Sequence, residues 1–160
     1  MRVRDRLVAG DRPAILRIVT AVGNFRPAEV AVAMELVDLG LSEDDRGYRF
    51  AVALGAAESD EVLGYASYGQ APMTDAVYEL YWIAVDPAWQ GRGVGRALLH
   101  TVERSVAACG GRMLLIDTES SDGYAAARRL YSAAGFTEEA RIRDYYYPGV
   151  DKVTFGRKIS

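Results

Sequence analysis

The chain of 160 residues is 50% hydrophobic and 26% charged, a composition that predicts one globular domain over residues 1–160. Its formal net charge of −3 offers no basic field for nucleic acid, and no apolar run reaches the ~20 residues that a membrane span needs. The single cysteine, Cys109, excludes an intrachain disulfide, and because no apolar leader opens the chain, the expected location is the cytoplasm.

The first half of the chain is expected to form a strand, two helices and three further strands. The alternating residues of Arg2–Leu7 predict the first strand. Asp11 is a suitable N-cap for a helix that carries Pro13 in its first turn. A second helix is expected over Pro27–Leu39, ending at Gly40. The three strands are predicted at Tyr48–Leu54, Val62–Tyr68 and Val77–Val85.

The second half alternates helices and strands. Apolar residues recur at helical spacing from Gly93 to Cys109, which predicts that the Cys109 thiol is a buried packing residue. The remaining elements are a strand at Met113–Ile116, a helix at Tyr124–Ala134, and strands at Thr137–Ile142 and Lys152–Ile159. A strand, helix and strand from Val77 to Ile116 imply a parallel pair, whereas the hairpin-like ends imply antiparallel neighbours. The expected sheet is therefore mixed.

A glycine-rich segment, Gln90-Gly91-Arg92-Gly93-Val94-Gly95-Arg96, lies between the strongest strand and an amphipathic helix. Its glycines let the backbone approach a ligand closely. The first N–H groups of a helix have no internal partner, and the helix dipole favours an anion there. Arginine side chains add charge that suits phosphate oxygens. The segment therefore predicts a pyrophosphate site, with a tight turn that holds no ligand as the alternative.

Two other nucleotide motifs fit this segment less well. A Walker loop requires a lysine after its last glycine, and none occurs here. In the dinucleotide fingerprint the third glycine comes one residue later than Gly95 does.

Two motifs in order resemble the GNAT superfamily of acetyl-coenzyme A-dependent N-acetyltransferases. The family's central signature begins with Gln or Arg, followed by two residues of any type, then Gly, one residue of any type, and Gly or Ala. Gln90, Gly93 and Gly95 match these positions. Leu130–Phe136 is similar to the second motif, a helix that ends in Tyr, three residues, Gly and Phe. The resemblance covers Val77–Phe136. It implies an α/β (α+β) fold with a mixed, mostly antiparallel sheet of about seven strands, a splayed parallel pair in its middle, and about four helices.

The resemblance also implies acetyl-CoA as the cosubstrate, held between the splayed strands Val77–Val85 and Met113–Asp117. The coenzyme arm would bond to the β-strand backbone, and an N–H near Val85 would polarise the thioester carbonyl. Many members carry Asn where this chain has Tyr124, so no coenzyme contact is assigned there. The coenzyme-binding residues would be Ile83, Ala84, Val85, Gln90, Gly91, Arg92, Gly93, Val94, Gly95 and Arg96.

The reaction implied is direct attack of a primary amine on acetyl-CoA in a ternary complex, with no acyl-enzyme. An alkylamine is mostly protonated at neutral pH and needs a base. Glu79 matches by spacing the catalytic glutamate of the histone-acetyltransferase branch, with Asp117 and Glu119 as alternatives. Tyr131 resembles the general acid that serves the leaving thiolate. His100 is expected at the surface, and one histidine and one cysteine predict no metal site.

The acceptor is expected to be a small-molecule amine, because acidic and aromatic groups suit a cation. The sequence does not decide whether the acceptor is an amino acid, a polyamine, an amine-bearing drug or a protein amino terminus. It also does not fix the length of the acyl group. Three rival functions are a non-catalytic acyl-CoA sensor, a protein N-terminal or lysine acetyltransferase, and a nucleotide-binding enzyme. Similar proteins often dimerise through the last strands, so a homodimer is considered as well. The candidate acceptor residues are Phe25, Glu29, Glu35, Tyr81 and Asp144-Tyr145-Tyr146-Tyr147.

Overall fold

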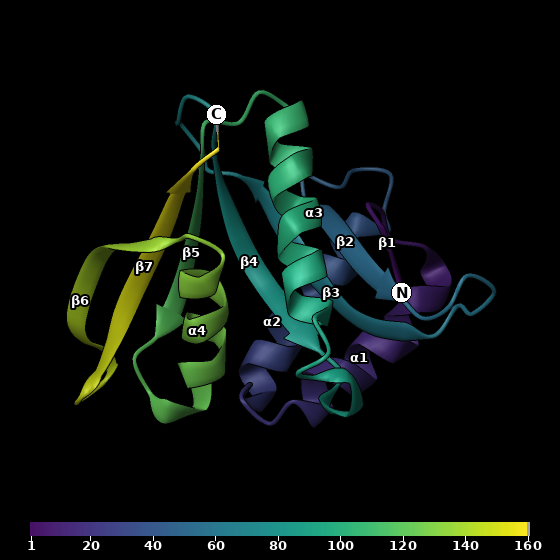
Figure 1. Cartoon of the computed structure of the whole chain (residues 1–160), viewed down its shortest axis with the longest axis horizontal. Coiled ribbons are helices and arrows are strands. Elements are labelled where there is room, and N and C mark those ends of the chain that lie inside the picture. Colours follow the sequence, from purple (N-terminus) through teal and green to yellow (C-terminus); the bar gives the residue numbers. More distant parts are fainter. Residues whose placement is uncertain (160) are drawn as a thin grey trace.

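A computed structural model describes residues 1–159 and shows a seven-stranded sheet with helices on both faces (Figure 1). The strands lie in the order β1-β2-β3-β4-β5-β7-β6, and all neighbours are antiparallel except β4 and β5. Their bounds are β1 Arg2–Arg4, β2 Arg49–Leu54, β3 Val62–Gln70, β4 Val77–Val85, β5 Met113–Glu119, β6 Thr137–Tyr147 and β7 Val150–Lys158. The mixed sheet with one central parallel pair is confirmed.

The helices cover the two faces of the sheet in pairs. They are α1 Arg12–Ala21, α2 Pro27–Gly40, α3 Val94–Ala108 and α4 Ala125–Ala133, with short 3-10 turns at Ala9–Asp11, Pro87–Trp89 and Asp122–Tyr124. One core lies under α3 and α4 and contains Leu98 and Val102, both fully buried. The other lies under α1 and α2 and contains Ile18 and Val37. Figure 1 shows α3 and α4 together on the near face.

Some elements differ in length from the sequence prediction. β1 ends at Arg4 because the Arg4 guanidinium and the Val8 N–H both bind the Asp11 carboxylate, which turns the chain early. That carboxylate therefore does not cap α1, although Asp11 precedes the helix. β5 extends to Glu119 and β6 extends to Tyr147, further than predicted, because β7 pairs with both strands up to these residues. Pairing partners distant in sequence thus set these strand ends.

One single-residue expectation was met and another was wrong. α2 ends at Gly40, as predicted; a Cβ there would lie 2.1 Å from the Phe50 ring, so the glycine also permits close packing. Cys109 is exposed rather than buried. The buried stripe of α3 ends at Val106, and the helix itself ends at Ala108, so the thiol falls beyond the apolar face.

The parallel pair separates halfway along its length. β4 and β5 pair only from Val77 opposite Met113 to Leu80 opposite Ile116. Beyond that point β4 stays with β3, β5 stays with β7, and the two strands diverge in Figure 1. On β3, Ser67 faces Trp82 and Tyr68 faces Leu80, which leaves Tyr81 as an unpaired bulge residue. Because a bulge bends its strand, Tyr81 helps to turn β4 away from β5.

Candidate active site

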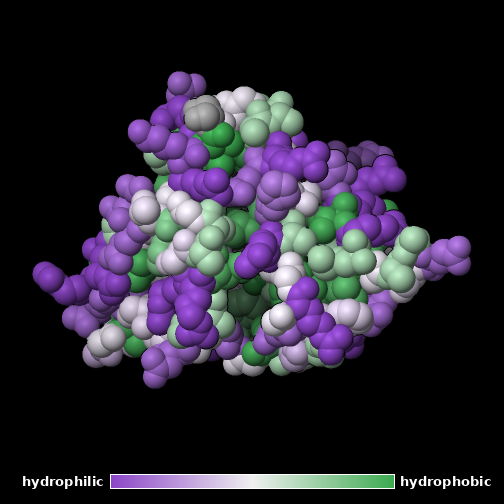
Figure 2. Space-filling view, in the orientation of Figure 1, coloured by the Kyte–Doolittle hydropathy of each residue, from purple (hydrophilic) through white to green (hydrophobic). Residues whose placement is uncertain are grey.

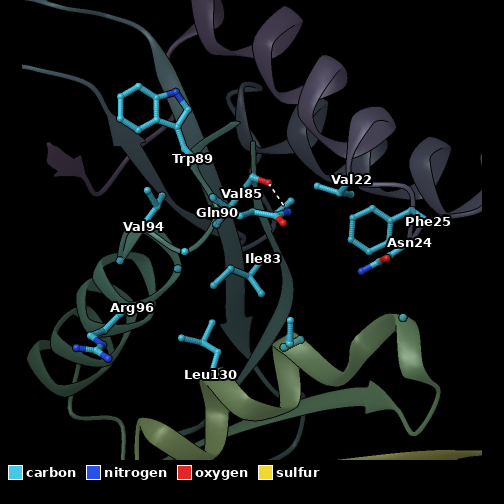
Figure 3. Close-up of a pocket in the computed structure, with 17 residues that line it drawn as sticks. Val22, Asn24, Phe25, Ile83, Val85, Trp89, Gln90, Val94, Arg96 and Leu130 are labelled. Atoms are coloured by element: carbon cyan, nitrogen blue, oxygen red, sulfur yellow. Dashed lines mark hydrogen bonds between the residues drawn. The ribbon is translucent and has the colours of Figure 1, made fainter. Parts of the chain in front are cut away.

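The opening between β4 and β5 leads into a cavity of 490 Å³. In Figure 2 the face that carries α3 and α4 is hollowed here, with apolar side chains in the recess and hydrophilic ones around it. Ile83 and Leu130 lie close together in Figure 3, with Phe25 and Asn24 on the opposite wall. The cavity is lined by Val22, Asn24, Phe25, Ile83, Ala84, Val85, Trp89, Gln90, Gly91, Gly93, Val94, Gly95, Arg96, Gly123, Ala126, Ala127 and Leu130.

The first turn of α3 presents unpartnered N–H groups to this cavity. Gly93 is the N-cap, with a left-handed φ of 83°, a conformation that favours glycine. The first helical bond runs from the Ala97 N–H to the Gly93 carbonyl at 3.0 Å, which leaves the N–H groups of Val94, Gly95 and Arg96 without a helical acceptor. With the helix dipole they form an anion site at the cavity wall.

The two arginines of the glycine segment are placed differently. Arg96 lines the cavity. Arg92 does not line it, and its guanidinium lies over the Trp89 ring, 5.1 Å from the centroid. The remaining predicted coenzyme residues of the loop and of β4 all line the cavity.

The edge of β4 that faces the opening carries free backbone groups. The Asp86 N–H donates to the Leu63 carbonyl of β3 at 2.8 Å. Because successive N–H groups of a strand point to opposite edges, the Val85 N–H points toward the opening. The Val85 carbonyl accepts a bond from Gln90 Nε2 at 3.3 Å (Figure 3). An extended ligand can therefore lie along β4 as an added strand.

Tyr131 belongs to a second cavity of 270 Å³ that adjoins the first and shares Asn24, Phe25, Ile83 and Ala127 with it. Tyr131 projects from α4, is 4% exposed, and packs against the Phe155 ring at 5.8 Å between centroids. Burial raises the pKa of the Tyr131 hydroxyl. The hydroxyl therefore stays protonated at neutral pH and can donate a proton.

Three carboxylates line this second cavity, and two of them are already paired. Glu29 binds Arg26 at 2.9 Å, which lowers the pKa of its carboxyl. Asp117 binds Lys152 Nζ at 3.1 Å and accepts a bond from the Thr154 hydroxyl.

Glu119 is the third carboxylate, and across residues 1–159 it has no cationic partner. It accepts only a 3.3 Å bond from the Ser121 hydroxyl. Glu119 is therefore the carboxylate in this cavity that is available to accept a proton.

Glu79 lies outside the cavity that holds Tyr131. It lines a neighbouring groove of 500 Å³, between α2 and the sheet, together with Leu36, Leu115 and Lys152. The groove and the second cavity share Tyr81, Trp82 and Asp117, so the two spaces adjoin. The structure therefore brings Glu119, and not Glu79, into one space with Tyr131.

The predicted acceptor residues divide into two groups. Phe25, Glu29, Tyr81 and Tyr146 line the second cavity. Those that line none of the three spaces are Glu35, Asp144, Tyr145 and Tyr147. Glu35 lies on the exposed side of α2, and Asp144 accepts a bond from the Gly149 N–H in the β6–β7 turn. His100 is exposed, as predicted.

The structure also adds residues that sequence reasoning missed. Tyr124 donates to the Asn24 carbonyl at 3.3 Å and so joins the α1–α2 loop to the segment before α4. Thr118 and Trp82 line the second cavity, and Lys152 neutralises Asp117. No local motif signals these contacts, because each contact joins segments that are far apart in the chain.

No helix within residues 1–159 is both long enough and apolar enough to cross a membrane. In the same part of the chain, no three or more His, Cys, Asp or Glu side chains gather as metal ligands would.

Comparison with known proteins identifies the family. Residues 23–136 match the model of the acetyltransferase (GNAT) family. The chain is 38% identical over 106 residues to the N-alpha-acetyltransferase RimI of Mycobacterium tuberculosis, an alignment that covers 65% of this chain and 64% of that protein. The matched segments span from 25% to 64% of the length of the first curated relatives. Other relatives are named for acetylating a ribosomal-protein alanine or methionine sulfoximine.

Solved structures agree with this match. A crystal structure described as a GNAT-family acetyltransferase of Desulfovibrio desulfuricans has a TM-score of 0.92 and 40% identity, and the alignment covers 99% of each chain. The structure of yncA from Salmonella typhimurium, solved with its cofactor acetyl-CoA, has a TM-score of 0.75 and 25% identity, and the alignment covers 100% of this chain and 94% of that one. This chain therefore belongs to the acetyltransferase (GNAT) family.

Proposed function

We propose that this protein transfers an acetyl group from acetyl-CoA to a primary amine, by direct attack in a ternary complex. One observation carries the proposal: the free N–H groups of α3, the open edge of β4 and the buried Tyr131 follow one another along adjoining cavities. Acetyl-CoA carries a diphosphate, an extended arm and a thioester in this order, and each group would bind one of the three features. Membership of the GNAT family supports the assignment.

The residues present fit the coenzyme along its length. The N–H groups of Val94, Gly95 and Arg96 would hold the diphosphate, since they have no helical acceptor. The free edge of β4 would receive the pantetheine arm. The Val85 N–H, which points toward the opening, would donate to the thioester oxygen as negative charge develops there.

The chemical steps fall to two side chains. In the proposed mechanism Glu119 accepts the proton of the acceptor amine, directly or through a water molecule. The amine nitrogen attacks the acetyl carbonyl carbon and the carbon–sulfur bond then breaks. Tyr131 gives its proton to the departing sulfur, and the second proton that the nitrogen loses on forming the amide returns to the Tyr131 oxygen. The products are the N-acetylated amine and free coenzyme A.

A screen for thiol release tests this function. The protein is incubated with acetyl-CoA and a panel of alkylamines, amino acids, aminoglycosides and peptides with an N-terminal alanine, and coenzyme A is measured. Release that requires an amine supports the enzyme. Tight coenzyme A binding without release from any amine would favour an acyl-CoA sensor. Thermal stabilisation by ATP, and none by coenzyme A, would favour a nucleotide-binding enzyme.

Two glycines that flank α3 provide a matched test of the diphosphate site. Gly93 and Gly110 both have positive φ, 83° and 74°, and a Cβ at either would meet nothing within 4 Å. An alanine at either position should cost roughly 1–2 kcal/mol of stability, because left-handed backbone disfavours a side chain. Only Gly93 lines the cavity. We expect Gly93→Ala to raise the Kd for coenzyme A by about 10-fold, a loss of about 1.4 kcal/mol.

Isothermal calorimetry of coenzyme A binding gives the comparison, with thermal unfolding of both variants as the stability control. Gly110→Ala should bind coenzyme A like the unmodified protein. Equal binding by Gly93→Ala and Gly110→Ala would remove the first turn of α3 from the coenzyme site.

The acceptor is proposed to be a small-molecule amine. The second cavity of 270 Å³ has room for a narrow chain beside Tyr131, and its lining is aromatic and acidic. A protein N-terminus is the second candidate, favoured by the identity to an N-alpha-acetyltransferase. The alanine peptides in the panel decide between the two.

A further inference from the structure

We propose that the acceptor is an elongated amine with a second positive charge, held by Glu79 at a distance from the reacting nitrogen. This inference rests on the proposed acetyl transfer and specifies its substrate class. It concerns the second cavity and the groove beyond it, which adjoin through Tyr81, Trp82 and Asp117. We refer to these two adjoining spaces, from Tyr131 to the groove beside α2, as the passage.

The charges along the passage do not cancel. Its lining holds Glu29, Glu79, Asp117 and Glu119 but a single cation, Lys152. Lys152 is engaged by Asp117, and Glu29 is engaged by Arg26 from outside the lining.

Two carboxylates therefore stay without a cationic partner in the described part of the chain, Glu119 beside Tyr131 and Glu79 in the groove. Arg128 lies near Glu119 but donates to backbone carbonyls, not to the carboxylate. A monoamine would neutralise one of the two charges, whereas a dication would neutralise both.

The spacing of the two carboxylates sets the length of the acceptor. Glu79 faces Leu115 in the β4–β5 register, and Glu119 lies four residues further along β5. At ~3.3 Å per residue the two positions are ~13 Å apart along the sheet. Each ammonium would lie about 3 Å from its carboxylate. The two nitrogens would then be roughly 7 Å apart if both lie on the line between the carboxylates, and roughly 13 Å apart if both lie to one side of it, so we take the middle value of roughly 10 Å. A linear diamine with about eight methylene groups has this span.

The wall between the two carboxylates suits a cationic chain. Tyr81 and Trp82 line both spaces, and aromatic faces attract ammonium groups and cover methylene groups. Thr118 supplies an independent sign of a missing partner: it lines the second cavity, is 5% exposed, and its hydroxyl has no hydrogen-bond partner within residues 1–159. That hydroxyl can accept a bond from an amine N–H. A free amino acid fits poorly, since its carboxylate would face Glu119.

Steady-state kinetics with four amines tests the inference. Diaminooctane spans the passage, octylamine has the same length with one charge, and diaminopropane has two charges that are too close together. We expect kcat/KM for diaminooctane to exceed that for octylamine by about 10-fold, as one partly buried ion pair would give. Diaminopropane should show no such advantage over propylamine.

The variant Glu79→Gln locates the second charge. It should reduce the ratio of kcat/KM for diaminooctane over octylamine from about 10 to about 1. Glu58→Gln, at an exposed residue of the β2–β3 loop, is the control and should keep the ratio. Equal kcat/KM for diaminooctane and octylamine in the unmodified protein, or an unchanged ratio in Glu79→Gln, would overturn the inference while acetyl transfer stands. Failure of every amine in the broader panel would overturn acetyl transfer itself.

Discussion

Replacing Tyr131 by phenylalanine should lower kcat by about 100-fold, the low end of the roughly 10²- to 10⁴-fold that general acid–base catalysis contributes. The phenyl ring keeps the packing against Phe155 and removes only the hydroxyl. In the proposed mechanism that hydroxyl protonates the leaving sulfur. Affinity for coenzyme A should change little, because Tyr131 does not line the cavity proposed to hold the diphosphate and the arm.

Tyr78→Phe is the matched control for this change. Tyr78 is also a buried tyrosine of the same core, at 6% exposure, but it lines none of the three spaces along the site. It should keep the unmodified kcat. If Tyr131→Phe retained kcat as well, the proton would have to reach the thiolate from elsewhere.

The raised pKa of Tyr131 predicts the alkaline behaviour of kcat. Burial disfavours the phenolate, so the hydroxyl stays protonated to a higher pH than a free tyrosine, whose pKa is about 10. The acid form, which is the active one, should therefore persist as the pH rises. We expect kcat at saturating amine to show no fall between pH 7 and about 10. A fall in that interval that disappears in Tyr131→Phe would contradict the raised pKa.

Glu119→Gln should lower kcat/KM for the amine by about 100-fold at neutral pH, because the amide cannot take the proton of an ammonium acceptor. As the pH approaches the pKa of the amine, near 10 for an alkylamine, free amine becomes available and the loss should shrink. The measurement is kcat/KM against pH for the variant and the unmodified protein. Curves that converge at high pH would identify a base, whereas a constant loss at every pH would identify a packing residue.

Glu79→Gln discriminates between the two candidate bases. The spacing of Glu79 in the sequence favours it, whereas the structure places it in the groove beyond Tyr131. With the monoamine octylamine, Glu79→Gln should keep the pH dependence of the unmodified protein. If Glu79→Gln rather than Glu119→Gln loses activity at neutral pH and recovers it in alkali, Glu79 is the base.

Local patterns in the sequence predicted the elements that line the proposed coenzyme site. The bounds predicted for β4, Val77–Val85, are those observed, because a run of aromatic and β-branched residues favours a strand whatever its neighbours. The glycine segment was also placed correctly, since the N-cap conformation of Gly93 depends on the local chain. These features need only residues close together in sequence.

The acceptor side depends on contacts that a local pattern does not contain. The bulge at Tyr81 is hidden because every residue around it is compatible with a regular strand. Lys152 neutralises Asp117 only because β7 pairs with β5. Tyr124 and Asn24 are 100 residues apart, and their bond forms only once the two sides of the opening face each other. The sequence therefore named both carboxylates and ranked Glu79 first, whereas the structure places Glu119 in one space with Tyr131.

A crystal structure of the protein with coenzyme A tests the central claim most directly. We predict the diphosphate at the N–H groups of Val94, Gly95 and Arg96, the arm along β4, and the sulfur near the Tyr131 hydroxyl. Coenzyme A bound elsewhere, with the first turn of α3 unoccupied, would contradict this account of the site.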